Sequence, residues 1–406
     1  MTSFINCCMV FFCLSFWQVS YAKTNVPLNE FINHYEPLIY PGKRLRAADR
    51  QLGRTHYLGF SAQGRTFQLN LRLDTSTLAP DAQIVDGDEK SIGFDRNSLF
   101  VGELVGEPGS SIHGILHDDG TFTGKIYSKD GVYFLESARK YFDKPTHFHS
   151  VIYKDEDVTY DVNFAEPKLA PVESNNNENN EVDDEKYLLS PRQRRATKSS
   201  YEDNTCFISM EADYTFLKMA KEAKLAVGEI LKHVQALNII YGSTFNTSGT
   251  YAPHSIQFRV GNIRVYDEKQ TPVSLRPLNI DIATFLSRMS KKDYSKFCEA
   301  LYFTSRDFEG GILGLAWIGH ARGRAGGMCD PRRGSNSYNT AVVTFSLHGR
   351  HSPPKVSEIT FAHEVGHAFG AEVCLLILKL LSKLKGSFLY VYIYIFYRDQ
   401  CAIFAS

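Results

Sequence analysis

The stretch with the clearest chemistry is PPKVSEITFAHEVGHAFG, which ends at Gly370 and contains His-Glu-x-x-His. On a helix, residues i and i+4 share one face, so His363 and His367 can offer their imidazoles to a single Zn²⁺ ion. Glu364 can reach a water on that ion and accept its proton as the water attacks a peptide carbonyl. The same carboxyl can then pass the proton to the leaving amine. The pattern predicts zinc-assisted hydrolysis of a peptide bond.

The third zinc ligand does not follow in its usual place. Longer forms of this motif place a third histidine three residues after the glycine, where this chain has Val373. Glu372 and Cys374 are alternative ligands, although the glutamate comes one residue early and the cysteine one residue late. Histidines outside the motif are expected to be ordinary surface or packing residues, namely His320, His348 and His351.

The N-terminus predicts a secreted protein. Residues 1–22 form an expected signal peptide, because the apolar run from Ile5 to Trp17 is too short to span a bilayer and precedes the small-x-small sequence Ser20-Tyr21-Ala22. We therefore expect the secretory pathway, with a secreted or cell-surface destination and no convincing transmembrane helix. Equal numbers of basic and acidic residues, 45 of each, do not favour a nucleic-acid partner.

An oxidising compartment favours disulfide formation. Cys206 and Cys298 stand at the starts of two predicted strands and are the best candidates for a disulfide. Cys329 has no obvious partner. Asn246 opens an Asn-x-Ser sequon in a predicted loop and is a candidate glycosylation site.

Two regions of different character flank an acidic linker. Residues 23–164 show alternating apolar strands and Asp-Gly turns, which predict an antiparallel β domain. Residues 165–195 are acidic and rich in asparagine, and they end in Arg192, Arg194 and Arg195 with the Arg-x-x-Arg spacing that proprotein convertases recognise. We expect cleavage after Arg195.

Residues 196–373 predict an incomplete domain of mixed helices and strands, so the fold class of the chain is α+β. Apolar residues at helical spacing across residues 214–245 predict one long amphipathic helix. Shorter strand patterns follow, and two prolines introduce the helix of the His-Glu-x-x-His motif. Residues 374–406 form an apolar tail that fits neither pattern, and we interpret it as an aberrant ending, with a partly membrane-attached tail as the alternative.

Four stretches together resemble the ADAM metalloproteases: the zinc motif, GILGLAWIG, YFTSRDF and FINHYEPLIY. The resemblance implies a β-rich propeptide followed by a partial metzincin domain, with a five-stranded mixed sheet and an active-site helix. It assigns His363 and His367 as zinc ligands and Glu364 as the catalytic acid/base. It also implies ectodomain shedding of membrane-anchored proteins, including Notch-type receptors and amyloid-precursor-type proteins. The GLAWIG strand would pair with extended substrate.

A second hypothesis belongs to another functional class. Because Val373 replaces the third histidine, the chain is alternatively a catalytically incompetent truncated isoform that binds or inhibits a full-length family protease or its substrates. The expected propeptide has no cysteine after the signal segment, so inhibition of the zinc site by a propeptide thiolate is not available within residues 23–164. Any inhibition by this segment is expected to be steric.

Overall fold

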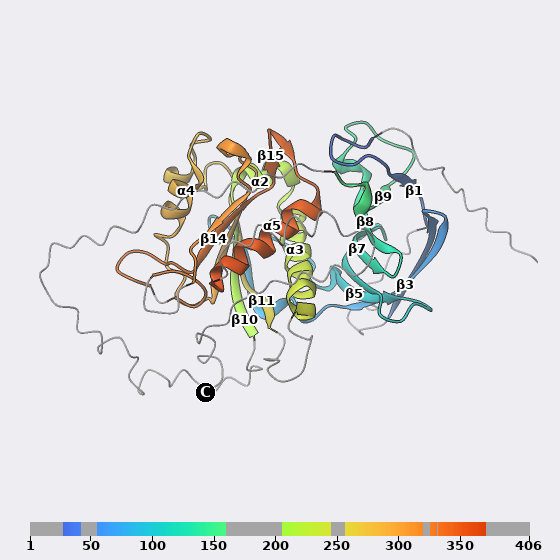
Figure 1. Ribbon diagram of the computed structural model, residues 1–406, viewed down its shortest axis with the longest axis horizontal. Coiled ribbons are helices and arrows are strands. Elements are labelled where there is room, and N and C mark those ends of the chain that lie inside the picture. The colour runs from blue at the N-terminus through green and yellow to red at the C-terminus, as the bar shows by residue number, and fades with distance from the viewer. Residues whose placement is uncertain are drawn as a thin grey trace, which may run out of the picture.

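The computed structural model describes residues 27–41, 55–159, 205–244, 256–319, 325–330 and 332–370, which form two lobes (Figure 1). Residues 27–159 supply the N-terminal lobe and residues 205–370 the C-terminal lobe. The expected signal peptide, acidic linker, convertase site, glycosylation site and apolar tail lie outside the described residues. Within the described part of the chain, no helix is long and apolar enough to cross a membrane.

The N-terminal lobe is built on an eight-stranded antiparallel sheet, which confirms the predicted antiparallel β architecture. Its order is β1-β9-β8-β7-β6-β5-β3-β2. Alternating apolar residues on one face bury a core that includes Phe60, Phe67 and Tyr133. The strands are β1 (Glu36–Leu38), β2 (His56–Ala62), β3 (Arg65–Leu73), β5 (Leu99–Leu104), β6 (Ser111–Leu116), β7 (Phe122–Ser128), β8 (Gly131–Ser137) and β9 (Ser150–Lys154).

The C-terminal lobe contains the expected five-stranded mixed sheet, in the order β13-β14-β12-β10-β11. These strands pair in parallel except for β13, which is antiparallel to β14. Their bounds are β10 (Thr205–Ala212), β11 (Gln257–Val265), β12 (Glu299–Thr304), β13 (Gly314–Ala316) and β14 (Thr340–Thr344), and a small hairpin follows as β15 (Ser346–Leu347) and β16 (Arg350–His351). A disulfide joins the predicted pair Cys206 and Cys298 at the starts of β10 and β12.

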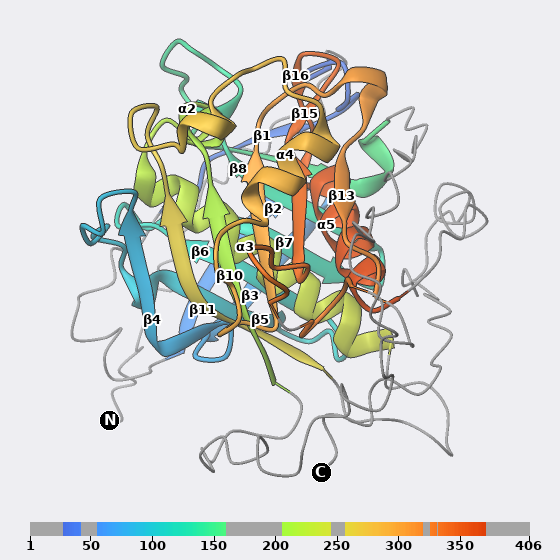
Figure 2. The same ribbon diagram turned by 90° about the vertical axis from the view of Figure 1, so that its left-hand side faces the viewer.

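A sixth strand comes from the N-terminal lobe. Strand β4 (Leu78–Asp86) leaves its own lobe and pairs in parallel with β11, at the far edge of the sheet from β13 (Figure 2). Leu78, Ala82 and Ile84 thereby enter the C-terminal hydrophobic core. The expected first domain therefore supplies a structural strand to the second.

Four described helices complete the C-terminal lobe: α2 (Tyr214–Ala220), α3 (Ala223–Thr244), α4 (Ile282–Met289) and α5 (Pro354–Ala368). The prediction of one long helix over 214–245 is wrong, because the chain breaks at Lys221, whose φ is 70°. The break lets Phe216 of α2 pack against Phe345 while the apolar face of α3 packs on the sheet. A single straight helix could not direct both surfaces into the core.

Candidate active site

Helix α5 carries the predicted zinc motif near its C-terminal end (Figure 1). Pro354 is at the first turn, where a missing N–H is tolerated. Gly370 ends the helix with φ 87°, a conformation that glycine adopts readily, and its N–H donates to the carbonyl of His367 at 2.8 Å. The predicted helix and its glycine cap are therefore present.

The two histidines converge as a pair of metal ligands must. The Nε2 atoms of His363 and His367 are 3.0 Å apart, and the rings are nearly perpendicular at 87°. Two imidazole nitrogens that share one tetrahedral zinc, each about 2.05 Å from the metal, are about 3.3 Å apart. The pair therefore fits two positions of a zinc coordination sphere. Among the described residues there is no group of three or more histidine, cysteine or acidic side chains that could hold a metal.

The environment keeps His363 in the form that binds a metal. Burial, together with the neighbouring His367, lowers the pKa of His363 to about 4. A neutral imidazole presents a lone pair to a metal, whereas the protonated ring does not.

The carboxyl group of Glu364 lies against strand β13. Glu364 is 4% exposed, and a Cβ atom added at Gly314 would lie 2.3 Å from its Oε1 atom. Only a glycine leaves this space for the carboxyl group. The residue that the motif predicts as the acid/base thus touches strand β13, to which the family resemblance gives the role of binding substrate backbone.

Contacts from three other segments fix the backbone of the motif. The Tyr241 hydroxyl in α3 donates to the Ala362 carbonyl at 2.9 Å. The N–H of Gly319, after β13, donates to the carbonyl of His367 at 2.9 Å, and the N–H of Met328 donates to the next carbonyl at 2.8 Å. These bonds tie the histidine pair to the edge strand and to α3, so the motif cannot shift without its neighbours.

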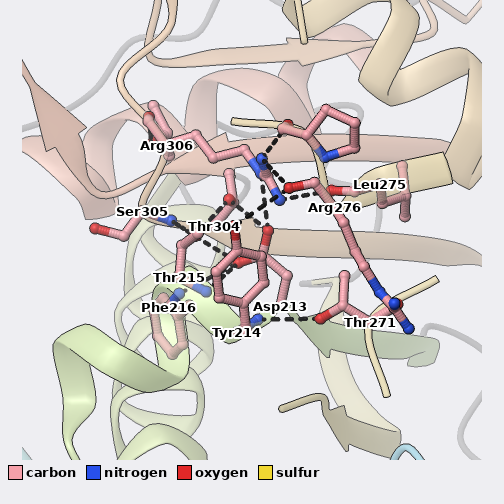
Figure 3. A network of polar contacts seen from close by, with 12 residues as sticks. Asp213, Tyr214, Thr215, Phe216, Thr271, Leu275, Arg276, Thr304, Ser305 and Arg306 are labelled. Atoms are coloured by element: carbon pink, nitrogen blue, oxygen red, sulfur yellow. Dashed lines mark hydrogen bonds and ion pairs between the residues drawn. The ribbon is translucent and has the colours of Figure 1, made fainter. Parts of the chain in front are cut away.

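A buried ion pair in the C-terminal lobe was not predicted from the sequence (Figure 3). Arg306 Nε lies 3.0 Å from Asp213 Oδ2, and both side chains are fully buried. Asp213 also caps α2 by accepting from the N–H groups of Thr215 and Phe216. Arg306 donates further to the carbonyls of Leu275 and Pro277. The pair joins α2, the end of β12 and the loop near Leu275. The YFTSRDF stretch, which contains Arg306, contributed to the family resemblance. The only local signal for the ion pair was a charged residue directly after a buried strand.

The remaining predicted residues divide between described and undescribed parts of the chain. His363, Glu364 and His367 lie together, and Cys206 is bonded to Cys298. His348 and His351 lie at the β15–β16 hairpin. The following residues lie outside the described part: His320, Arg192, Arg194, Arg195, Asn246, Glu372, Val373 and Cys374.

Comparisons with known proteins identify a family for the C-terminal lobe. Residues 223–373 match the model of the reprolysin-like metallo-peptidase family M12B. Fold and site therefore define a reprolysin-like metallopeptidase domain, a class that is zinc-dependent by family.

Curated relatives extend the similarity into the N-terminal lobe. The human disintegrin and metalloproteinase domain-containing protein 10 is 34% identical over 378 residues, which cover 85% of this chain and 49% of the human protein. The Xenopus laevis protein of the same name is 33% identical over 378 residues, with the same coverage. The Caenorhabditis elegans homologue is 29% identical over 435 residues, covering 89% of this chain and 45% of that protein.

The chain belongs to the ADAM metalloproteases, a family of metalloendopeptidases. It spans about half the length of the curated relatives it matches. Among solved structures, a chaperone–substrate complex aligns over 41% of this chain and 26% of its own chain, at 15% identity and a TM-score of 0.26, which is too low to bear on the fold.

Proposed function

We propose that the protein is a zinc-dependent endopeptidase zymogen of the ectodomain-sheddase type. One observation carries the proposal: the His363–His367 pair converges beside a glutamate whose carboxyl group lies against the edge strand β13. This arrangement brings two metal ligands, an acid/base and a backbone-binding strand into one place. The substrates that we infer are protein ectodomains anchored in membranes, of the Notch-receptor and amyloid-precursor types.

His363 and His367 would hold zinc, which when bound polarises a peptide carbonyl and acidifies a water molecule. Glu364 accepts the proton of the attacking water on a carboxylate oxygen and transfers it to the nitrogen of the leaving amine. The contact with Gly314 holds this carboxyl group at the strand. Burial of Glu364 limits bulk water around the carboxylate and strengthens its electrostatic effect.

Strand β13 supplies the substrate-binding edge. It is the terminal strand of the described sheet and pairs with β14 through Gly314, Leu315 and Ala316. Its other edge is suited to an extended substrate strand, whose main-chain groups would pair with it. This mode suits unfolded or extended juxtamembrane segments better than folded domains.

Conversion of the zymogen is proposed to require a proprotein convertase acting after Arg195. The N-terminal lobe packs on the segment that leads into β13, because Phe31, Ile32 and Tyr35 share a core cluster with Leu313. Its contact beside the edge strand supports steric inhibition without a cysteine. Cleavage in the linker would remove the covalent connection between the lobes.

The test is zinc content and cleavage of a fluorogenic peptide by convertase-treated full chain. We expect stoichiometric zinc and cleavage that falls 10²–10⁴-fold in Glu364→Gln, with zinc retained, because the general base is lost. The matched control is Glu309→Gln, which changes an exposed glutamate near β13 and should leave the rate unchanged.

Absence of both zinc and cleavage in the wild type would overturn the proposal. Retained binding to a full-length family protease would then support the alternative function as a binding or inhibitory fragment.

A further inference from the structure

The contact between the two lobes contains a buried group of ionisable side chains, here named the interlobe cluster. It lies where β6 packs against α3. The approach is close, because a Cβ atom added at Gly228 in α3 would lie 2.7 Å from Ile115 in β6. A cavity of about 20 Å³ within the cluster is large enough for a single water molecule. His113 and Lys125 line this cavity from the N-terminal lobe.

The charges of the interlobe cluster are already balanced. It contains three lysine–glutamate ion pairs: Lys125 with Glu358, Lys232 with Glu229, and the partly exposed Lys140 with Glu136. The first pair links the N-terminal lobe directly to helix α5, which carries the zinc motif. Among the described residues that line the cavity, each carboxylate therefore has a lysine partner, and no further positive charge is needed.

Of the ionisable side chains in this cluster, His113 has the fewest neighbours that could stabilise a positive charge. It is 1% exposed, and its Nδ1 atom has no hydrogen-bond partner among the described residues. Lys125 is the residue directly opposite His113 in the pairing of β6 with β7. The centre of the His113 ring lies 5.7 Å from the centre of the Tyr127 ring. Burial, followed by Lys125, Lys232 and His233, lowers the pKa of His113 well below its ordinary value.

His233 differs because the C-terminal lobe itself satisfies both of its ring nitrogens. Its Nδ1 atom is 2.8 Å from the Glu229 carbonyl, and its Nε2 atom is 2.8 Å from the Ser357 hydroxyl. Separation of the lobes leaves those bonds in place. Separation exposes His113, which lies on the other side of the contact.

We propose that His113 makes the contact between the N-terminal lobe and helix α3 sensitive to acid. Above neutral pH the imidazole is neutral and the cluster is balanced. In an acidic compartment, protonation of His113 adds a third positive charge beside Lys125 and Lys232 and loosens the lobe from α3. This regulation goes beyond the proposed protease function and requires neither zinc nor peptide cleavage.

The sign and size of the effect follow from proton linkage. In the closed contact His113 stays neutral, whereas in the opened contact it faces water with an ordinary pKa near 6.5. The stabilisation is therefore complete above this pKa and is lost as pH falls below it. At pH 5.5 an exposed histidine is about 90% protonated, so opening becomes about tenfold more favourable than at pH 7.4. Glu229 does not contribute in this range, because Lys232 and Lys140 overcome the effect of burial and hold its pKa at about 2.

The experiment is backbone hydrogen exchange of the intact chain at pH 7.4 and 5.5, corrected for the intrinsic effect of pH on exchange. We expect amide protection in β6 and in the adjoining part of α3 to fall about tenfold at pH 5.5, while β12 and β14 keep theirs. The His113→Phe variant cannot take up the proton and should lose this pH dependence. The control is His147→Phe, which alters an exposed histidine of the same lobe and should retain it.

Equal protection at the two pH values in the wild type would overturn the proposal, as would full pH dependence in His113→Phe. If His113→Phe does not fold, exchange at the imidazole C2 position of wild-type His113 provides a second measurement. A midpoint well below 6.5 supports the proposal, and an ordinary midpoint near 6.5 refutes it.

Discussion

The buried pair of Asp213 and Arg306 provides a direct test of what stabilises the C-terminal lobe (Figure 3). The perturbation is Arg306→Met, which keeps most of the aliphatic stem and removes the charge and its donors. Arg306 currently contacts Asp213 and the carbonyls of Leu275 and Pro277. All of these contacts are lost together in the variant.

The expected cost is about 4 kcal/mol of unfolding free energy. Removing one partner of a buried ion pair costs about 3–5 kcal/mol, because the remaining charge is left uncompensated. Asp213 keeps its bonds from Thr215 and Phe216, which limits the loss. The carbonyl groups near Leu275 lose their donor, and each unsatisfied buried group costs about 1–3 kcal/mol. The loss of unfolding free energy is therefore expected to stay large.

The assay is equilibrium unfolding in urea, followed by the fluorescence of Trp317. This residue is the only tryptophan after Trp17, so it reports on the C-terminal lobe once the signal segment is absent. The control is Arg350→Met, which removes an ion pair with Glu30 in which the arginine side chain is 63% exposed. Exposed pairs contribute about 0–1 kcal/mol, so this variant should unfold close to the wild type. The reasoning is refuted if Arg306→Met loses less than about 1 kcal/mol, or if the two variants are equally destabilised.

Two further variants test the lobe contact and the site. Lys125→Met should destabilise the protein by about 3–5 kcal/mol in the same unfolding assay, because Glu358 is left buried and unpaired. The double variant with Glu358→Gln should recover part of this loss, and a purely additive loss would contradict the argument. Gly314→Ala should lower the peptide-cleavage rate about 10²-fold with zinc retained, because the new methyl group displaces the Glu364 carboxyl by about 1 Å. Gly59→Ala adds a methyl group in an open strand position and should leave the rate unchanged; equal rates for both variants would count against the role of Gly314.

Strand β4 makes the two lobes structurally dependent on each other. The turn before it is organised by Asp74, whose carboxyl accepts from Ser76 and Thr77 and also from Gln235 of α3 at 2.8 Å. Arg259 of β11 donates to the carbonyl of Ser76. Removal of the N-terminal lobe would therefore expose both a strand edge and part of a hydrophobic core. The two lobes share one sheet, so the N-terminal lobe is a structural part of the C-terminal lobe as well as a segment that packs against it.

Several features of the protein were predictable from the sequence because their signals are local. His363, Glu364 and His367 are close along one helix, and the i, i+4 spacing brings the imidazoles together in any α-helix. The glycine after that helix and the alternation of the strands are also local patterns. The Cys206–Cys298 pair was predicted because both cysteines stand at the starts of predicted strands, and the structure pairs those two strands in parallel.

Other features depended on contacts between distant segments, which local patterns do not contain. Strand β4 joins β11 across more than 170 residues of sequence, as Gln83 pairs with Asn262. The break at Lys221 depends on where α3 must pack, since helical periodicity alone continues through it. Burial of Arg306 and the balanced charges around His113 likewise exist only once the segments meet. The sequence alone predicted zinc-assisted hydrolysis for helix α5. The tertiary structure decided which residues hold that helix in place, because burial and charge pairing arise from the packing of remote parts of the chain.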